Sequence, residues 1–83
     1  MKIEILTQDN CPKCGSLKMY VTHGLAEEHR NKVEWVHKET NPKRFQELVE
    51  QHEIMTTPAI IVGEQVLRET TPLQIESFLK EVK

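Results

Sequence analysis

Two cysteines, Cys11 and Cys14, are the residues whose type and spacing most directly indicate chemistry. They enclose Pro12 and Lys13 in a Cys-x-x-Cys pattern. In a reducing compartment such a pair is more often catalytic or metal-binding than structural. As a structural disulfide it would close a very short loop and remove little entropy from the unfolded chain. The pair therefore predicts thiol-disulfide exchange or metal binding.

Two elements must position these cysteines. Residues 2–7 alternate apolar and polar side chains and include one further leucine, which predicts a strand covered on both faces. From Pro12, apolar residues recur at helical spacing, which predicts a helix that ends near Gly24 or by Arg30. Cys11 therefore lies at the junction of a strand and a helix.

At this junction Cys11 takes the N-cap position of the helix. The amides of Lys13 and Cys14 can then donate to its sulfur, and the positive end of the helix dipole favours an anion there. Pro12 loses no hydrogen bond at the first helical position, because an N–H there has no partner within the helix. Such surroundings lower the pKa of a cysteine from about 8.5 to roughly 3.5–7.5. We therefore expect Cys11 to be the attacking thiolate.

Cys14 shares a helix face with Leu17 and Val21 and is expected to be the more buried sulfur. Burial keeps its thiol protonated until it is needed. From this position it can attack a mixed disulfide on Cys11 and release the reduced substrate. The spacing thus predicts a two-step dithiol mechanism in which Cys14 is the resolving cysteine.

A zinc site is the alternative that the residue types raise. The histidines are scattered, and solvated surface or partial packing is the expected role of each of them: His23, His29, His37 and His52. Cys14 and His23 lie on one expected helix, about 13 Å apart at ~1.5 Å per residue, which is too far to share a zinc ion. We therefore expect no metal site in the chain and nominate no histidine as a catalyst.

A second candidate feature is Thr57-Pro58, just before an apolar run. Proline has no amide to donate to a sheet, so it suits the entry to a strand. It also suits a cis peptide bond beside an active site, which would leave the Thr57 backbone free to pair with an extended substrate. The residues alone leave both interpretations open.

The rest of the chain continues the alternation of strands and helices. Residues 33–37 are β-branched and aromatic and predict a second strand. A helix begins at Asn41, an N-cap residue followed by proline, and residues 59–68 predict a hairpin with a turn at 63–65. Thr71 caps a last helix, whose apolar residues are Ile75, Phe78, Leu79 and Val82.

This order, βαβαββα, predicts an α/β fold. The first strands should form a right-handed parallel βαβ unit, to which the hairpin adds antiparallel strands. We expect a mixed four-stranded sheet with helices on both faces, in a single domain over residues 1–83.

Length and charge limit the classes of function. The 83 residues suit one domain, and 11 Lys and Arg against 13 Asp and Glu leave no basic surplus to attract nucleic acid or an anionic membrane. The first residues turn polar too soon for a signal peptide, and no stretch approaches the roughly 20 apolar residues that span a bilayer. We expect a cytoplasmic monomer with no nucleic-acid or membrane partner.

Over nearly its whole length the chain resembles the thioredoxin superfamily. Residues 6–14 resemble the active-site entry of glutaredoxins, and residues 53–62 resemble the superfamily's cis-proline segment with its following strand. The resemblance implies a thioredoxin-like fold and a cis bond before Pro58. It also implies substrate contacts from Pro12, Lys13, Thr57 and Pro58.

Departures from the glutaredoxins bear on the electron donor. Lys13 stands where they usually have Tyr or Phe. Arg68-Glu69 and Thr70-Thr71 fall opposite the paired glycines and polar residues that hold glutathione. The two threonines can still offer hydroxyls to a ligand. We expect weak activity with glutathione and better reduction by a thioredoxin-reductase-type flavoenzyme.

The chain also departs from the thioredoxins, which usually have Trp before the first cysteine and a buried acid on the preceding strand. Here these positions hold Asn10 and the apolar Ile5. The chain is thus similar to the small glutaredoxin-like or thioredoxin-like proteins that thioredoxin reductase serves.

Taken with the resemblance, the sequence predicts a thiol-disulfide oxidoreductase that reduces protein or small-molecule disulfides. No bound cofactor is expected, and glutathione or the flavoenzyme would supply the electrons. Two other classes stay open. One is an iron-sulfur or metal carrier, in which Cys11 from two chains and two external thiols hold a cluster. The other is a redox-regulated adaptor whose Thr57 edge binds a partner without turnover.

Overall fold

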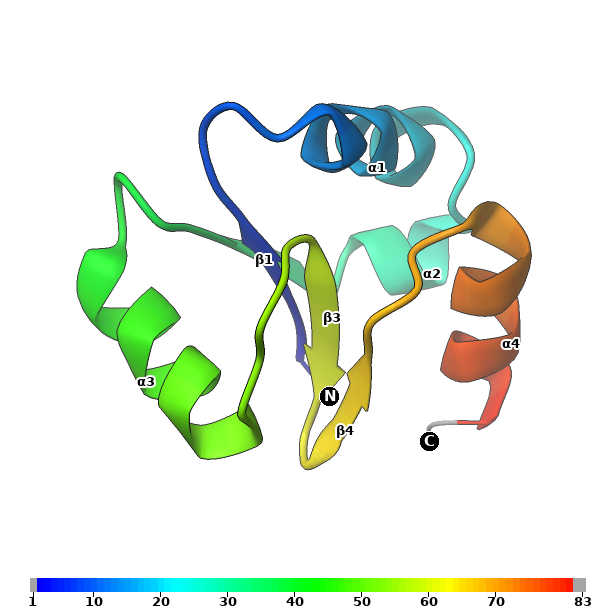
Figure 1. Ribbon diagram of the computed structural model, residues 1–83. Helices are drawn as coiled ribbons and strands as arrows, with labels where there is room; N and C mark the ends of the chain where they lie inside the picture. The colour runs from blue at the N-terminus through cyan, green and yellow to red at the C-terminus, as the bar shows by residue number, and fades with distance from the viewer. Residues whose placement is uncertain (1, 82–83) are drawn as a thin grey trace.

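The computed structural model describes residues 2–81. Its strands are β1 (Ile3–Thr7), β2 (Val33–His37), β3 (Ala59–Val62) and β4 (Gln65–Leu67). Its helices are α1 (Pro12–His23), α2 (Glu27–Arg30), α3 (Pro42–His52) and α4 (Pro72–Glu81) (Figure 1). Val82, which was expected to extend the apolar stripe of the last helix, lies outside the described residues. Within residues 2–81, no helix is both long and apolar enough to cross a membrane.

The strands form one mixed sheet in the order β2-β1-β3-β4. β1 pairs with β2 in parallel, and it pairs with β3 in the antiparallel direction. β3 and β4 form the predicted antiparallel hairpin. Gly63, whose φ is +61°, lies in its turn, and β4 begins at Gln65, one residue earlier than expected. The predicted α/β class and mixed four-stranded sheet are confirmed.

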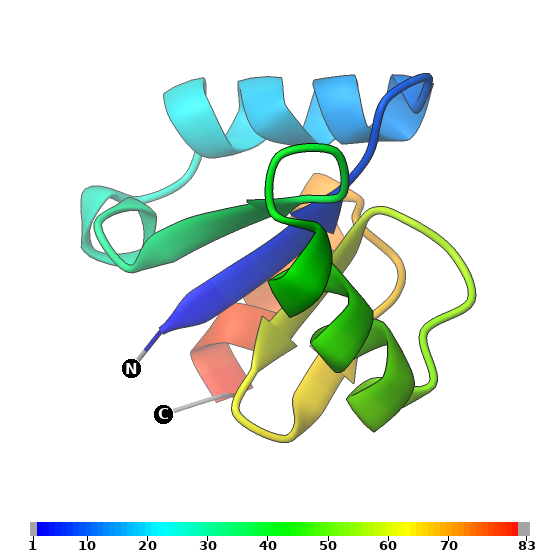
Figure 2. The ribbon, with the colours of Figure 1, turned by 90° about the vertical axis from the view of Figure 1, so that its left-hand side faces the viewer.

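Helices cover both faces of the sheet. Figure 2 shows α3 in front of the sheet and α4 behind it. On the face of α1 and α4, Leu17 and Ile75 pack with Ile5 of β1. On the face of α3, Phe45 packs with Leu6 of the same strand. Because successive residues of β1 point to opposite faces, both Ile5 and Leu6 are buried, as expected for a strand covered on two sides.

The region after α1 differs from the sequence expectation. α1 ends at His23, in agreement with the expected end near Gly24, but a separate short helix, α2, follows. Gly24 lies between them, and a Cβ atom at Gly24 would be 2.9 Å from the Tyr20 ring. That close approach favours glycine at the point where the chain leaves α1. The prediction of a single helix reaching Arg30 is therefore wrong.

α3 is attached to the sheet by an ion pair. Arg44 donates from Nε and Nη2 to the two carboxylate oxygens of Glu4, at 2.8 Å each. Glu4 is buried, and its hydrogen bonds raise the pKa of the Arg44 guanidinium. Asn41 takes the predicted N-cap position of α3, but its side chain makes no capping hydrogen bond. Its role as a side-chain cap is thus not seen, and Pro42 at the first turn supports the start of the helix.

Candidate active site

The two cysteines lie at the start of α1, joined by a disulfide bond. A short loop leads to them from the end of β1. Asn10, whose φ is +58°, turns the chain there, a conformation that asparagine tolerates better than most residues. The strand and the helix thus place the pair at the carboxyl end of the central strand β1, where the sequence predicted it.

Cys11 has the geometry of an N-cap. Its backbone is extended, with φ −124° and ψ 95°, and its Sγ accepts a hydrogen bond from the Cys14 amide at 3.2 Å. Its carbonyl accepts from the amides of Cys14 and Gly15, which begins the helical hydrogen bonding. Cys11 is half-buried, whereas Cys14 is only 6% exposed. Cys14 is thus the more buried of the two residues, as expected.

Thr57 and Pro58 lie against Cys11. The peptide bond between them is cis, which decides between the two interpretations that the sequence left open. The Thr57 hydroxyl donates to Cys11 Sγ at 3.8 Å, and the Thr57 carbonyl oxygen lies 3.9 Å from the same sulfur. A residue far along the chain therefore contacts the sulfur that is expected to react first.

The residues expected to contact a substrate gather beside this pair. A pocket of about 660 Å³ lies between α1, the Thr57 segment and the start of α4, and its lining includes Lys13, Thr57, Pro58, Thr70 and Thr71. An adjoining pocket of about 460 Å³ is lined by Pro12 together with Cys11. All six expected substrate-binding residues thus surround one end of α1.

Arg68 and Glu69, the residues that replace the glycines of the glutathione site, also line the larger pocket. Arg68 donates from Nη2 to the carbonyl oxygen of His52 at 3.0 Å. Its guanidinium is therefore held toward the end of α3, where one of its N–H donors is already paired with a backbone carbonyl. Both side chains bring bulk to a place where a glycine would leave the backbone open.

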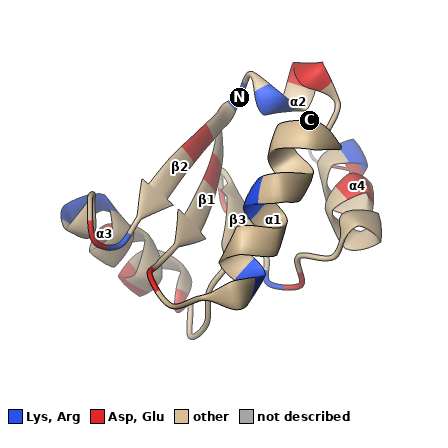
Figure 3. Ribbon diagram, turned by 90° about the horizontal axis from the view of Figure 1, so that it is seen from above, with Lys and Arg blue, Asp and Glu red and all other residues tan. Residues whose placement is uncertain are grey.

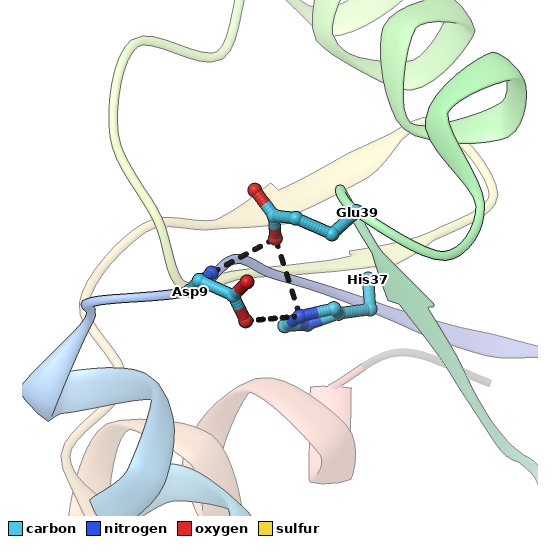
Figure 4. Close-up of side chains that lie close together, drawn as sticks. All are labelled: Asp9, His37 and Glu39. Carbon is cyan, nitrogen blue, oxygen red and sulfur yellow. Dashed lines mark hydrogen bonds and ion pairs between the residues drawn. The ribbon is translucent and has the colours of Figure 1, made fainter.

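The opposite side of the disulfide holds a histidine that sequence reasoning missed. A smaller pocket of about 240 Å³ is lined by Thr7, Asp9, His37 and Lys18 together with both cysteines. His37 is not simply a solvated or packed histidine. Its Nε2 lies 3.0 Å from Asp9 Oδ1 and 3.2 Å from Glu39 Oε1, and its Nδ1 lies 2.8 Å from Thr7 Oγ1. Figure 4 shows the two carboxylates converging on the imidazole from different loops.

A topological signal could have found this cluster. In a parallel βαβ unit the carboxyl ends of neighbouring strands meet at one edge of the sheet. Thr7 pairs with His37 in the register of β1 and β2. Asp9 and Glu39 each follow one of these strands by two residues, so they meet beside His37.

The same three residues are where a cation could bind. Within residues 2–81, Asp9, His37 and Glu39 form the group of possible metal ligands whose donor atoms lie within 4.8 Å of one another. Here those donors satisfy each other, because both carboxylates face Nε2 and Glu39 Oε1 also accepts the Asp9 amide at 2.9 Å. The contacts are those of a hydrogen-bonded network.

The charges over this end of the molecule are mixed. Figure 3, which looks onto α1, shows acidic and basic residues interspersed over the elements. The loop before α1 carries Asp9, and α1 carries Lys13 and Lys18.

Two solved structures share this fold. A point mutant of the thioredoxin-like protein BC3987 superposes with a TM-score of 0.72 at 20% identity, covering 94% of this chain and 99% of that one. The unmutated BC3987 protein gives 0.67 at 22% identity, covering 95% and 97%. Among curated proteins no relative matches.

A family match agrees with this likeness of fold. Residues 1–79 match the family described as Thioredoxin domain, a span that includes the strand before Cys11, the cis bond before Pro58 and most of α4. With nearly the whole chain matched and the cysteine pair at the start of α1, the chain belongs to the thioredoxin domain family.

Proposed function

We propose that the protein is a dithiol thiol-disulfide oxidoreductase that reduces protein or small-molecule disulfides through Cys11 and Cys14. The position of Cys11 Sγ carries this proposal, because the Cys14 amide donates to it at 3.2 Å at the N-terminus of α1. In the reduced protein, the same amide and the helix dipole favour the thiolate and so lower the pKa of the Cys11 thiol.

The proposed reaction has two exchange steps. The Cys11 thiolate attacks one sulfur of the substrate disulfide, forms a mixed disulfide and expels the first substrate thiolate. Cys14 then attacks Cys11 Sγ, which forms the Cys11–Cys14 disulfide and expels the second thiolate. Two electrons pass from the protein to the substrate. The disulfide present here is the oxidised product of that cycle, which supports the proposal.

The substrate is proposed to lie along Thr57 and into the larger pocket. Thr57 lies against Cys11 Sγ, so a peptide beside its backbone would bring a disulfide close to the sulfur. Lys13, Thr70 and Thr71 line the space where its flanking residues would lie. Disulfide-containing proteins are therefore the proposed partners.

The electron donor is proposed to be a thioredoxin-reductase-type flavoenzyme, with glutathione a weak donor. Glu69 in the larger pocket repels the carboxylates of glutathione, and Arg68 is partly engaged by the His52 carbonyl. In this proposal the protein works as a cytoplasmic monomer with no bound cofactor.

A coupled assay tests the function. Insulin reduction is followed with NADPH and thioredoxin reductase in one arm, and with NADPH, glutathione and glutathione reductase in the other. We expect turnover in the first arm, much weaker turnover in the second, and none in either arm for Cys11→Ser. Absence of turnover by the wild-type protein in both arms would contradict the proposal.

A reconstitution experiment separates this function from a cluster carrier. The reduced protein is incubated anaerobically with iron, sulfide and glutathione. We expect a colourless monomer, and a coloured dimer would favour the carrier.

A further inference from the structure

We propose that Asp9, His37 and Glu39 bind one divalent cation of the zinc class at the carboxyl ends of β1 and β2. Two observations carry this inference. Three ligand atoms from two loops and a strand lie close together, and a buried hydroxyl holds the other nitrogen of the His37 ring (Figure 4). The sequence expectation of no metal site was drawn from the spacing of cysteines and histidines and did not include carboxylates.

The separations between the donor atoms suit coordination of one ion. Zinc binds nitrogen and carboxylate oxygen at about 2.0–2.2 Å, so neighbouring ligands lie about 2.8–3.6 Å apart, from a right angle to a tetrahedral angle. His37 Nε2 lies 3.0 Å from Asp9 Oδ1 and 3.2 Å from Glu39 Oε1, both within this interval. All three donor atoms lie within 4.8 Å of one another. Small rotations of the two carboxylates are enough to place a cation between them.

The sheet brings these ligands together before any ion binds. Thr7 pairs with His37 in the parallel register of β1 and β2, and Asp9 and Glu39 each follow their strand by two residues. Glu39 Oε1 accepts a hydrogen bond from the Asp9 amide at 2.9 Å, which joins the two loops. Because these contacts already exist, binding has to order little of the chain.

Thr7 holds the imidazole in the orientation that a metal ligand needs. Thr7 is 5% exposed, and its Oγ1 lies 2.8 Å from His37 Nδ1, so Nε2 faces the carboxylates. A histidine that binds a metal through one nitrogen donates the N–H of the other to an oxygen, which fixes its tautomer. A hydroxyl both donates and accepts. It therefore suits the metal-free ring, in which Nε2 carries the proton, and the metal-bound ring, in which Nδ1 carries it.

The charges of the cluster favour a dication. Two carboxylates lie within 3.2 Å of one nitrogen, and a neutral imidazole offers them a single N–H to share. Lys18 lines the adjoining pocket, with its Nζ 5.6 Å from the Trp35 ring centroid. Two negative charges against this one positive charge leave an excess that a cation between the carboxylates would neutralise. Asp9 and Glu39 are 65% and 42% exposed, so an ion can reach them from solvent.

The donor set also selects the class of cation. One imidazole nitrogen with two carboxylate oxygens suits borderline ions such as Zn²⁺ and Co²⁺, whereas Mg²⁺ and Ca²⁺ prefer sites made only of oxygen. Three protein ligands leave a further position for water. Asp9 lies two residues before Cys11, so the bound ion would fasten the loop that leads to Cys11 to the turn after β2.

Titration of the oxidised protein with Zn²⁺ tests the site. The Cys11–Cys14 disulfide removes both thiolates as competing ligands, and the protein is prepared without a histidine tag. Isothermal titration calorimetry should find one Zn²⁺ per chain and much weaker binding of Mg²⁺. His37→Gln removes the nitrogen ligand and should weaken Zn²⁺ binding by about 100-fold or more, beyond the effect of an outer partner. Thr7→Val removes only the hydroxyl and should weaken it by about 10-fold.

The matched control is His29→Gln. His29 Nε2 lies 3.8 Å from Glu28 Oε1, so it is also a histidine beside an acid, and Glu28 is its one ion-pair partner within residues 2–81. The affinity of this variant for Zn²⁺ should equal that of the wild type. Asp9→Asn, at an exposed loop position, should weaken binding by about 10-fold. It serves as the test if His37→Gln does not fold.

The outcomes are independent of the proposed function, because every measurement is made on the oxidised protein without turnover. Absence of Zn²⁺ binding, or equal affinity in the wild type and His37→Gln, would overturn the metal site and leave the cluster a hydrogen-bonded network only. Equal affinity for Mg²⁺ and Zn²⁺ would overturn the assignment to the zinc class. Failure of the insulin assay would contradict the dithiol function and leave the metal site standing.

Discussion

The two sides of the disulfide differ in space and in chemistry. On the Thr57 side, pockets of about 660 and 460 Å³ are lined by threonines and prolines together with charged residues that include Lys13, Arg68 and Glu69. On the His37 side, a pocket of about 240 Å³ is lined by Asp9, Lys18 and the imidazole. The side of the two larger pockets, here called the wide side, thus offers more room for a peptide than the side of the smaller pocket, here called the narrow side. The disulfide thus separates a larger surface suited to peptide binding from a smaller pocket that is lined by charged side chains.

The largest effect is expected where the narrow side meets the disulfide. Cys14→Ser should leave attack by Cys11 intact but remove the resolving sulfur, so turnover should be lost and a mixed disulfide should persist on Cys11. Mass spectrometry of the protein after incubation with a disulfide substrate detects the adduct. Recovery of an adduct on Cys14 in Cys11→Ser, at a comparable rate, would reverse the two roles and break the comparison.

The next effect is expected on the wide side. Arg68→Gly/Glu69→Gly should open the backbone to glutathione and restore two or three contacts of about 1 kcal/mol each, which raises glutathione-dependent turnover by about 10- to 100-fold. The assay is the coupled reaction with glutathione reductase. Turnover of the same variant with thioredoxin reductase serves as the control, and its rate should not change. Unchanged glutathione activity would show that these two residues do not limit the donor.

A smaller effect is expected at Thr57. Thr57→Val removes the hydroxyl that lies 3.8 Å from Cys11 Sγ but keeps the branched shape of the side chain. Loss of one long hydrogen bond to the thiolate should slow attack by Cys11 by about 2- to 5-fold. The rate of Cys11 alkylation by iodoacetamide measures this. A matching change in the resolving step would mean that the two sides are not separate.

The smallest effect is expected at Met55, which is 90% exposed beside the wide side. Met55→Ser should change the free energy of unfolding by less than about 0.5 kcal/mol, because the side chain buries little surface. Ile60→Val, at a core position that is 1% exposed, should cost about 0.5–1.5 kcal/mol for a single methylene. Urea unfolding compares the two. A loss at Met55 as large as at Ile60 would place Met55 in the packed structure.

The sequence predicted those parts of the fold and site that depend on local pattern. The proline after Cys11 marked the start of a helix, and the strands of β-branched residues were found at 33–37 and 59–62. The resemblance to the thioredoxin superfamily supplied the cis bond before Pro58. The helix start and the strands are determined by neighbours in the sequence, whereas the cis bond was left open by the residues alone and followed only from the resemblance.

The parts that were missed depend on contacts between separate elements. The ring of His37 is held by residues from two loops and a strand, and nothing in its own neighbourhood distinguishes it from His52. α2 has only four residues and no side-chain capping hydrogen bond, so its local pattern is weak. Asn41 has the residue type of a cap, but its φ of −137° and ψ of 59° are set by the turn that precedes α3.

The central place of β1 has a consequence for synthesis on the ribosome. Residue 4 pairs with residue 34 on one side and with residue 61 on the other. The first strand, β1, can therefore be paired on both sides only after β3 has been synthesised. Closing so long a segment is entropically unfavourable until many contacts form together. A nascent chain that ends before β3 has neither half of its hydrophobic core complete and has no Thr57 beside Cys11. Both the core and the surroundings of the reactive sulfur are therefore completed late in translation.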